Sequence, residues 1–355
     1  MEALAFASLL AVVGFAARDG TPAFQENKSD LLVYLDKTGT LRPVRTIADW
    51  GIRRERVLRN MQLVMGDMPD RAKAVPLDMK VIEETDCPKY VRKKITFAVE
   101  SWDRLPAYLL IPKGLQGKIP AVLCLHPTSE FGKEVVVGLR EKPNRNYAEE
   151  LAERGYVTLA PDYPGFGEYV MARRMLYEKG YASCTMKGIW NHRRCVDLLE
   201  SLPEVDGSRI GCIGHSLGGH NTLFAGVFDE RIKVMVSSCG FTAFPKYMDG
   251  DLTGWTHDGY MPRIATVYEK DPAKMPFDFT EVLGVLAPRA VFVNAPLHDD
   301  NFDASGVEDC IRAAKPVFEL FGVKDNLRVV HPEGGHDFPV EAREQTYAFI
   351  DHALK

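Results

Sequence analysis

Short apolar runs alternate with helical patterns from residue 119 to the end of the 355-residue chain. Continuous apolar runs of this length predict strands that are buried on both faces, and the segments between them have the length and spacing of helices. This alternation predicts a doubly wound α/β domain, in which a mostly parallel sheet carries helices on both faces. The six predicted strands cover residues 119–125, 156–160, 209–213, 232–236, 290–293 and 327–330.

Two features precede this alternation. Residues 49–65 carry apolar side chains at helical spacing, and residues 90–99 and 104–111 form a predicted strand pair around a turn. We therefore expect residues 18–89 to form an N-terminal extension that contains a helix. Residues 90–355 are expected to form the main α/β domain.

The N-terminus has the composition of a targeting signal. Residues 3–17 are apolar apart from one serine and one glycine, which is too short for a bilayer span of about 20 residues. The stretch fits the apolar region of a secretory signal, with a small-x-small cleavage site at residues 14–16, although no basic residue precedes Arg18. We expect a signal peptide over residues 1–17 and a secreted or periplasmic protein. The alternative is an apolar helix docked on a cytoplasmic protein.

Composition and motifs exclude several classes of protein. Hydrophobic residues make up 46% of the chain, charged residues 26%, and the net charge is −5, which is ordinary for a globular protein. No basic run is interleaved with aromatic residues, so we expect no nucleic-acid partner. The seven cysteines lack a C-x-x-C pair or zinc-ligand spacing, and no phosphate-binding or dinucleotide-binding loop is present. The sequence therefore predicts free thiols, with a single Cys184–Cys195 disulfide as the alternative. It predicts no metal and no cofactor.

A candidate nucleophile follows the third predicted strand. The sequence G-H-S-L-G-G occupies residues 214–219, between the strand over residues 209–213 and a helical pattern. This is the G-x-S-x-G motif in the context that it requires. The turn is so sharp that the positions two before and two after the serine must be small, and these are Gly214 and Gly218. We therefore expect Ser216 to lie exposed at a helix N-terminus, where amide groups favour developing negative charge.

A serine needs a base and an orienting acid to act as a nucleophile. In this architecture the order along the chain is serine, then acid, then histidine. His336 follows the last predicted strand in a glycine-rich loop and is the candidate base. The acid follows the fifth strand, where Asp299 stands three residues before an apolar side chain; Asp300 and Asp303 remain alternatives.

Two backbone N–H groups must stabilise the oxyanion that forms during acyl transfer. The residue after the nucleophile, Leu217, supplies one of them. The loop after the first predicted strand supplies the other, and Pro127 has no N–H group to donate. We therefore expect Thr128 to be the second donor.

These motifs resemble those of the α/β-hydrolase superfamily. Within it, the chain is similar to bacterial dienelactone-hydrolase-like and acetyl-xylan-esterase-like proteins, which also carry an N-terminal helical extension. The resemblance is carried by residues 49–50, 65–69, 162–168, 214–219, 299–302 and 335–338.

The resemblance implies an α/β-hydrolase fold, a Ser216–His336–Asp299 catalytic triad and no cofactor or metal. The stretch over residues 299–302 is also similar to that of prolyl-oligopeptidase-type peptidases, in which the first aspartate is the acid. One departure is Pro127, because many members have glycine after the corresponding histidine. Pro127 directly precedes Thr128, so this departure lies in the loop that is expected to supply the second oxyanion donor.

A long insertion separates the fourth and fifth predicted strands. Residues 240–288 exceed a plain connection and contain eight aromatic side chains, so we expect a cap-like insertion over the cleft. Most of these aromatic side chains are expected to pack the insertion against the domain. Trp255 and Tyr260 are expected to bind substrate, by contacting a sugar or aryl leaving group.

The sequence therefore predicts a serine carboxylic-ester hydrolase of the carboxylesterase or acetyl-esterase type (EC 3.1.1). Its expected substrates are short-acyl, acetyl-type esters of a sugar or aryl alcohol, without stable membrane insertion. One alternative is a peptidase with the same triad, and ~90 residues before the sheet are too few for the propeller that often gates such enzymes. Another is a binding protein on a hydrolase scaffold, which the intact triad order disfavours. The sequence does not predict the oligomeric state.

Overall fold

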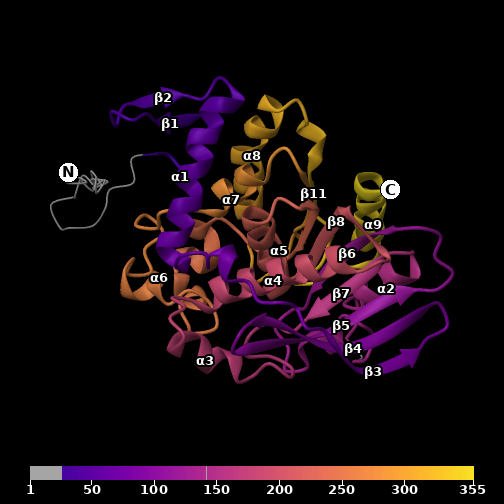
Figure 1. The fold of residues 1–355 in the computed structure, drawn as a ribbon. Helices are drawn as coiled ribbons and strands as arrows, with labels where there is room; N and C mark the ends of the chain where they lie inside the picture. Colours follow the sequence, from indigo (N-terminus) through magenta and orange to yellow (C-terminus); the bar gives the residue numbers. More distant parts are fainter. Residues whose placement is uncertain (1–25, 141) are drawn as a thin grey trace, which may run out of the picture.

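A single large sheet runs through the protein (Figure 1). The structure is a computed structural model that describes residues 26–140 and 142–355. The sheet has nine strands in the order β11-β10-β9-β8-β6-β7-β5-β4-β3. The expected signal peptide over residues 1–17 lies outside the described residues.

Six neighbouring strands form the parallel part of the sheet, and each corresponds to one of the predicted apolar runs. All of the pairings among them are parallel. The doubly wound α/β fold is therefore confirmed. The strands are β6 (Ile119–Leu125), β7 (Val157–Pro161), β8 (Val205–His215), β9 (Ile232–Ser238), β10 (Ala290–Asn294) and β11 (Leu327–Val330).

The other end of the sheet is antiparallel. The predicted strand pair is β4 (Tyr90–Glu100) and β5 (Asp103–Pro112), and β5 joins β7. An additional strand, β3 (Lys80–Asp86), pairs with β4, so the sheet begins within the expected N-terminal extension. A separate short hairpin, β1 (Val33–Leu35) and β2 (Leu41–Pro43), precedes the first helix.

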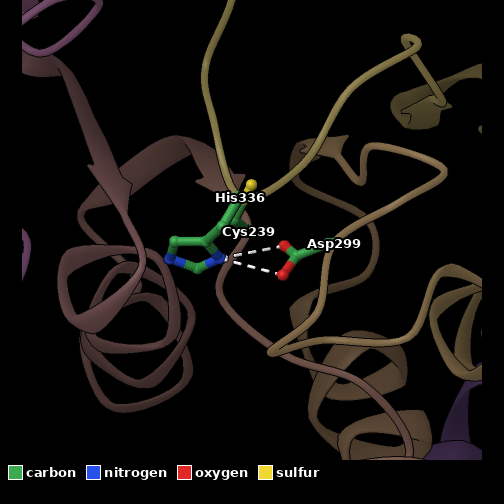
Figure 2. Close-up of side chains that lie close together, drawn as sticks. All are labelled: Cys239, Asp299 and His336. Carbon is green, nitrogen blue, oxygen red and sulfur yellow. Dashed lines mark hydrogen bonds and ion pairs between the residues drawn. The ribbon is translucent and has the colours of Figure 1, made fainter.

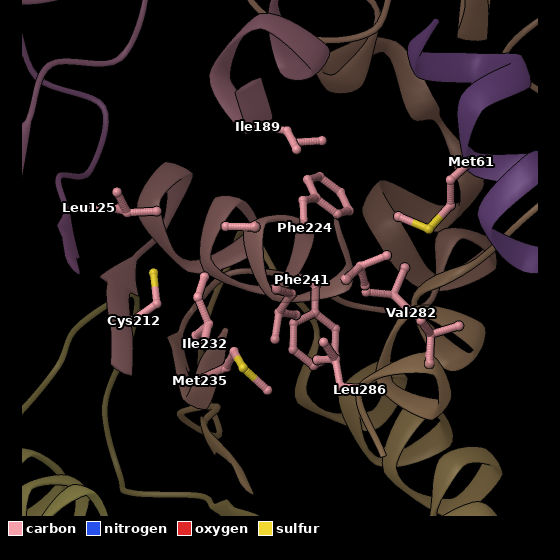
Figure 3. Close-up of a cluster of buried hydrophobic side chains, with 14 of the residues drawn as sticks. Met61, Leu125, Ile189, Cys212, Phe224, Ile232, Met235, Phe241, Val282 and Leu286 are labelled. Atoms are coloured by element: carbon pink, nitrogen blue, oxygen red, sulfur yellow. The ribbon is translucent and has the colours of Figure 1, made fainter. Parts of the chain in front are cut away.

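Helices cover both faces of the sheet. One core cluster joins α2 and α9 to one face, and a second, larger cluster joins α1, α4, α5, α7 and α8 to the other. Figure 3 shows part of the larger cluster, which includes Ile189 and Phe224 of the helices and Cys212 and Met235 of the sheet. The helices are α1 (Ile47–Met65), α2 (Tyr147–Glu153), α3 (Ala172–Glu178), α4 (Cys184–Ser201), α5 (Leu217–Phe228), α6 (Arg263–Thr266), α7 (Phe279–Leu286), α8 (Ala304–Leu320) and α9 (Val340–Leu354).

The N-terminal extension packs on the insertion between β9 and β10. The guanidinium group of Arg53 on α1 is fully buried and pairs with Glu281 on α7 at 2.6 Å and with Glu26 at 3.2 Å. Trp50 packs beside Gly284 of α7. These contacts tie the insertion to the N-terminal extension.

Two further properties bear on the sequence predictions. All seven cysteines are free thiols, and only Cys87 is not fully buried. Among residues 26–140 and 142–355, no helix is long and apolar enough to cross a membrane.

Candidate active site

The turn after β8 holds Ser216 in an unusual backbone conformation. Ser216 has φ +55° and ψ −118°, in the positive-φ region that L-residues rarely adopt. A Cβ atom on Gly214 would lie 2.2 Å from the carbonyl oxygen of Gly218, and one on Gly218 would lie 2.0 Å from that of Leu125. Only glycine fits at either position. The turn between β8 and α5, the nucleophile elbow, folds back on itself at Gly214 and presses against the end of β6 at Gly218. The serine side chain is thereby held at the N-terminus of α5.

The loop after β10 positions the carboxylate of Asp299. One of its oxygens accepts hydrogen bonds from the backbone N–H groups of Asn301 (2.9 Å) and Phe302 (3.0 Å). Burial favours a raised pKa for Asp299, but the hydrogen bond to His336, its charge and the two amides outweigh burial and lower that pKa. The carboxylate is therefore ionised at neutral pH.

The two alternative acids lie elsewhere. Asp300 is exposed. Asp303 caps α8 by accepting hydrogen bonds from the backbone N–H groups of Ser305 and Gly306. Of the three candidates, Asp299 is the one whose carboxylate meets His336.

His336 lies in the loop between β11 and α9, opposite Asp299 (Figure 2). Its Nδ1 atom is 3.0 Å from both carboxylate oxygens of Asp299. The ring also packs beside Phe302 and His215, with ring centroids 5.9 Å and 4.9 Å away. Because the carboxylate fixes the proton on Nδ1, the Nε2 atom of neutral His336 is left as the proton acceptor.

A buried polar network supports this histidine from behind. Asn294 at the end of β10 donates to the Ser238 hydroxyl and to the backbone carbonyl of Asp337, each at 2.9 Å. The same hydroxyl lies 2.9 Å from Nδ1 of His215. Burial lowers the pKa of His215 well below its usual value, so its ring is neutral and does not repel a protonated His336.

The loop after β6 is braced by His126. Its Nε2 accepts a hydrogen bond from the backbone N–H of Tyr163 (2.9 Å), so Nδ1–H donates to the carbonyl of Pro127 (2.7 Å). Thr128 follows and is exposed beside Ser216. The Leu217 amide is the first of α5, which leaves it without an acceptor inside the helix. The two expected oxyanion donors therefore flank the serine.

Two cavities of different size flank Ser216. The smaller has a volume of about 70 Å³ and is bounded by Leu217, His220, Tyr247, Trp255, Tyr260 and Phe302, among others. The larger, of about 530 Å³, is bounded by Thr128, Lys142, Arg145, His215, His336 and Asp337, among others. A cleft of about 640 Å³ between β11 and α9 lies away from these residues. We place the site at Ser216, where the groups suited to acyl transfer converge.

Trp255 and Tyr260 line the smaller cavity, as the insertion was expected to line the cleft, but they are not among the residues that bound the larger one. Both residues therefore lie beside Ser216, and their contact with a sugar or aryl leaving group stays a prediction. Trp255 is also packed against Tyr247 and Phe279 of the insertion.

His220 lines the smaller cavity and was not among the site residues predicted from the sequence. It lies one helical turn after Ser216, a spacing that places both residues on the same face of α5 and could have revealed it. Its Nδ1–H donates to the carbonyl of Gly240 (3.2 Å), and burial lowers its pKa to about 3. Within the described residues, neither its Nε2 nor the Trp255 Nε1–H has a hydrogen-bond partner.

The structure also brings together one set of side chains that could bind a metal. Within the described residues, Cys239, Asp299 and His336 offer ligand atoms that all lie within 4.8 Å of one another (Figure 2). Cys239 follows β9 and has φ +46°. The sequence contains no metal-binding spacing, because the three residues come from three separate loops.

The chain is similar to several known hydrolases. A family model described as glucuronyl esterase of fungi matches residues 174–322. A putative hydrolase, YtaP of Bacillus subtilis, is 27% identical over 312 residues, which cover 84% of this chain and all of that protein. A 4-O-methyl-glucuronoyl methylesterase of Phanerochaete carnosa is 25% identical over 191 residues, and these cover 49% of this chain and 47% of the relative.

Solved structures show the same fold. A glucuronoyl esterase from Solibacter usitatus superposes with a TM-score of 0.72 and 22% identity, covering 96% of this chain and all of that one. A protein described as a putative acetyl xylan esterase from Bacteroides fragilis gives a TM-score of 0.63 and 19% identity, covering 81% and 76% of the two chains. This likeness confirms the α/β fold that the sequence predicts.

Proposed function

We propose that this chain, a carboxylic-ester hydrolase of the α/β-hydrolase superfamily, acts through Ser216 as nucleophile, His336 as base and Asp299 as orienting acid. The observation that carries the proposal is the contact of His336 Nδ1 with both oxygens of Asp299, beside the strained Ser216. This arrangement matches the roles in a serine hydrolase triad.

The reaction follows from these positions. Nε2 of His336 takes the hydroxyl proton as Ser216 attacks the ester carbonyl, and Asp299 stabilises the resulting imidazolium. The N–H groups of Leu217 and Thr128 stabilise the oxyanion. His336 then protonates the leaving alkoxide, which leaves an acyl-enzyme. Water activated by the same histidine hydrolyses the acyl-enzyme and restores the serine.

The two cavities support a small acyl group. About 70 Å³ holds roughly two water-sized groups, which suits an acetyl group better than a long acyl chain. The larger cavity borders His336, where the leaving alcohol must receive its proton, and has room for a sugar or aryl alcohol. We therefore assign the smaller cavity to the acyl group and the larger one to the alcohol.

A uronic-acid ester is the second candidate. The fungal glucuronyl esterase model matches residues 174–322, and three relatives are named as 4-O-methyl-glucuronoyl methylesterases. In such a substrate the sugar ring is the acyl portion. It would have to enter the smaller cavity, while a simple alcohol leaves through the larger one.

Hydrolysis rates on matched substrates separate the candidates. We expect kcat/KM for an acetylated xylo-oligosaccharide to exceed that for methyl glucuronate by at least tenfold, with no cleavage of a peptide amide. Ser216→Ala serves as the control for contaminating esterases. A preference for methyl glucuronate would assign the sugar to the acyl side, and peptide cleavage would favour the peptidase alternative.

We further propose that the protein is exported through the signal over residues 1–17 and acts outside the cytoplasm on a carbohydrate ester. The support is the apolar segment with its small-x-small cleavage site. N-terminal sequencing of protein from the producing cells tests this proposal. We expect a mature chain that begins near Ala17, and a cytoplasmic chain that retains residues 1–17 would contradict it.

A further inference from the structure

Three loops bring a thiol, a carboxylate and an imidazole together behind the catalytic cleft. Cys239 follows β9, Asp299 follows β10 and His336 follows β11, and these three strands are neighbours in the sheet. Their ligand atoms all lie within 4.8 Å of one another (Figure 2). The backbone of Cys239 adopts φ +46°, which turns the chain at the end of β9. At this turn the Cys239 thiol lies beside Asp299 and His336.

We propose that Cys239, Asp299 and His336 form a reversible binding site for Zn²⁺ or a similarly thiophilic divalent cation such as Cd²⁺, and that occupation of this site inhibits the enzyme. Thiolate sulfur, carboxylate oxygen and imidazole nitrogen are the three ligand types that zinc takes in proteins. The inhibition rests on the proposed function, whereas the binding does not.

The charges of the cluster suit a divalent cation. A thiolate and a carboxylate together carry two negative charges, and a neutral imidazole adds none, so the occupied site is neutral. This balance limits the cost of burying an ion beside Cys239, which is 2% exposed, and Asp299, which is 8% exposed. The nearby Arg145 guanidinium is itself paired with Asp337 at 2.5 Å, so its charge is compensated.

Binding would remove the base from catalysis. The ring nitrogen that faces Asp299 is Nδ1, and it must give up its proton to coordinate the ion. The proton of the neutral ring then resides on Nε2, which can no longer accept the proton of Ser216. The thiol proton of Cys239 passes to solvent as the thiolate forms. The resting thiol is protonated, because burial raises its pKa and Asp299 raises it further.

The ligand set also predicts selectivity. Mg²⁺ and Ca²⁺ prefer sites built from oxygen ligands, so neither should bind here. His336 borders the larger cavity, whereas Cys239 and Asp299 do not, so an ion must pass the imidazole ring to reach the thiolate and the carboxylate. Within the described residues, the thiol also lies 3.2 Å from the carbonyl oxygen of Asp337.

Cadmium binding tests the site without relying on catalysis. Enzyme freed of metal with EDTA is titrated with Cd²⁺ while the ultraviolet thiolate-to-cadmium absorption is followed, in the parent and in Ser216→Ala. Both should give one band with a stoichiometry of one ion, and Cys87→Ser, which alters the least buried thiol, should retain it. Cys239→Ser and Cys239→Ala should lose it. Absence of the band in the parent, or its survival in both Cys239 variants, would overturn the proposal.

Zinc titration of ester hydrolysis tests the consequence. Each variant is compared with its own rate in EDTA, so a change in basal activity does not affect the result. We expect Zn²⁺ but not Mg²⁺ to inhibit the parent, EDTA to restore the rate, and Cys239→Ala to raise the inhibitory concentration by at least about tenfold. Stoichiometric cadmium binding without zinc inhibition would refute the inhibitory role. If the parent hydrolyses no ester but still shows the cadmium absorption band, the proposed function is refuted and the metal site is not.

Discussion

His336 can act as a base only through the ring nitrogen that Asp299 does not engage. The Asp299 carboxylate lies 3.0 Å from Nδ1 and is itself held by two backbone N–H groups. Its lowered pKa keeps it ionised when His336 becomes protonated. Orientation of the ring and stabilisation of the imidazolium therefore depend on the same side chain.

Replacement of this carboxylate provides the first prediction. Asp299→Asn should reduce kcat by roughly 10⁴-fold, because an amide cannot hold the required tautomer or stabilise the cation. The matched variant Asp300→Asn changes an exposed neighbour and should retain activity within a few-fold. Initial rates on a nitrophenyl acetate measure both. Equal losses, or a larger loss for Asp300→Asn, would assign the acid differently.

At the residue scale, the order of serine, acid and histidine along the chain identified the side chains that the structure brings together at the cleft. The sequence left Asp299, Asp300 and Asp303 open, because a loop of adjacent aspartates does not reveal which one faces inward. Cys239 could not be found this way, since its relation to Asp299 exists only once β9 and β10 pair.

The elbow between β8 and α5 is constrained by backbone contacts rather than by side-chain packing. Gly218→Ala would place a methyl group 2.0 Å from the Leu125 carbonyl oxygen, so the helix must move away from β6. We expect a fall in thermal stability and loss of most ester hydrolysis, measured by melting temperature and kcat. Gly51→Ala on α1 is the matched control, because open space surrounds that position and alanine favours a helix. A Gly218→Ala variant as stable and active as the parent would contradict this account.

The insertion supplies one wall of the acyl cavity. Trp255→Ala should enlarge this cavity and so favour longer acyl groups. We expect the ratio of kcat/KM for a butyrate ester to kcat/KM for an acetate ester to rise by about tenfold, which corresponds to the binding energy of a few methylene groups. Tyr268→Ala removes another buried aromatic ring of the insertion that does not border the cavity, and should leave the ratio unchanged. An unchanged ratio in Trp255→Ala would make Trp255 a packing residue only.

Elements differed in how well the sequence predicted them. The six parallel strands were found because burial on both faces produces continuous apolar runs. Strand β3 was missed, since Lys80–Asp86 forms the exposed edge of the sheet and carries no apolar pattern. Helix α7 was also missed, although Asp278 and Glu281 form a capping box at its start that could have revealed it.

At the scale of the whole molecule, the buried histidines make one contribution to the pH dependence of the free energy of unfolding. Burial lowers the pKa of His192 and His220 to about 3 and also lowers those of His126 and His215. An unfolded histidine titrates near ~6.5, so the unfolded chain binds more protons between about pH 3 and 6.5. The contribution of these histidines to the free energy of unfolding therefore rises with pH through that window.

Two buried carboxyl groups oppose this trend. Burial raises the pKa of Asp278 to about 6 and that of Glu281 to about 7, so their contribution falls as pH rises from about 4 to 7. Four histidines outnumber two acids, and we expect a higher urea midpoint at pH 7 than at pH 5. His192→Leu should reduce this difference, and the exposed His352→Ala should not. Greater stability of the parent at pH 5 would contradict the prediction.

The central claim is that Ser216, held at the elbow beside the His336–Asp299 pair, is the nucleophile of an ester hydrolase. The most direct measurement is kcat for ester hydrolysis by Ser216→Ala, in preparations shown to be folded and free of contaminating esterases. We predict a loss on the order of 10⁴-fold or more, because the members of a triad act as a unit. Hydrolysis within tenfold of the parent rate would contradict the account.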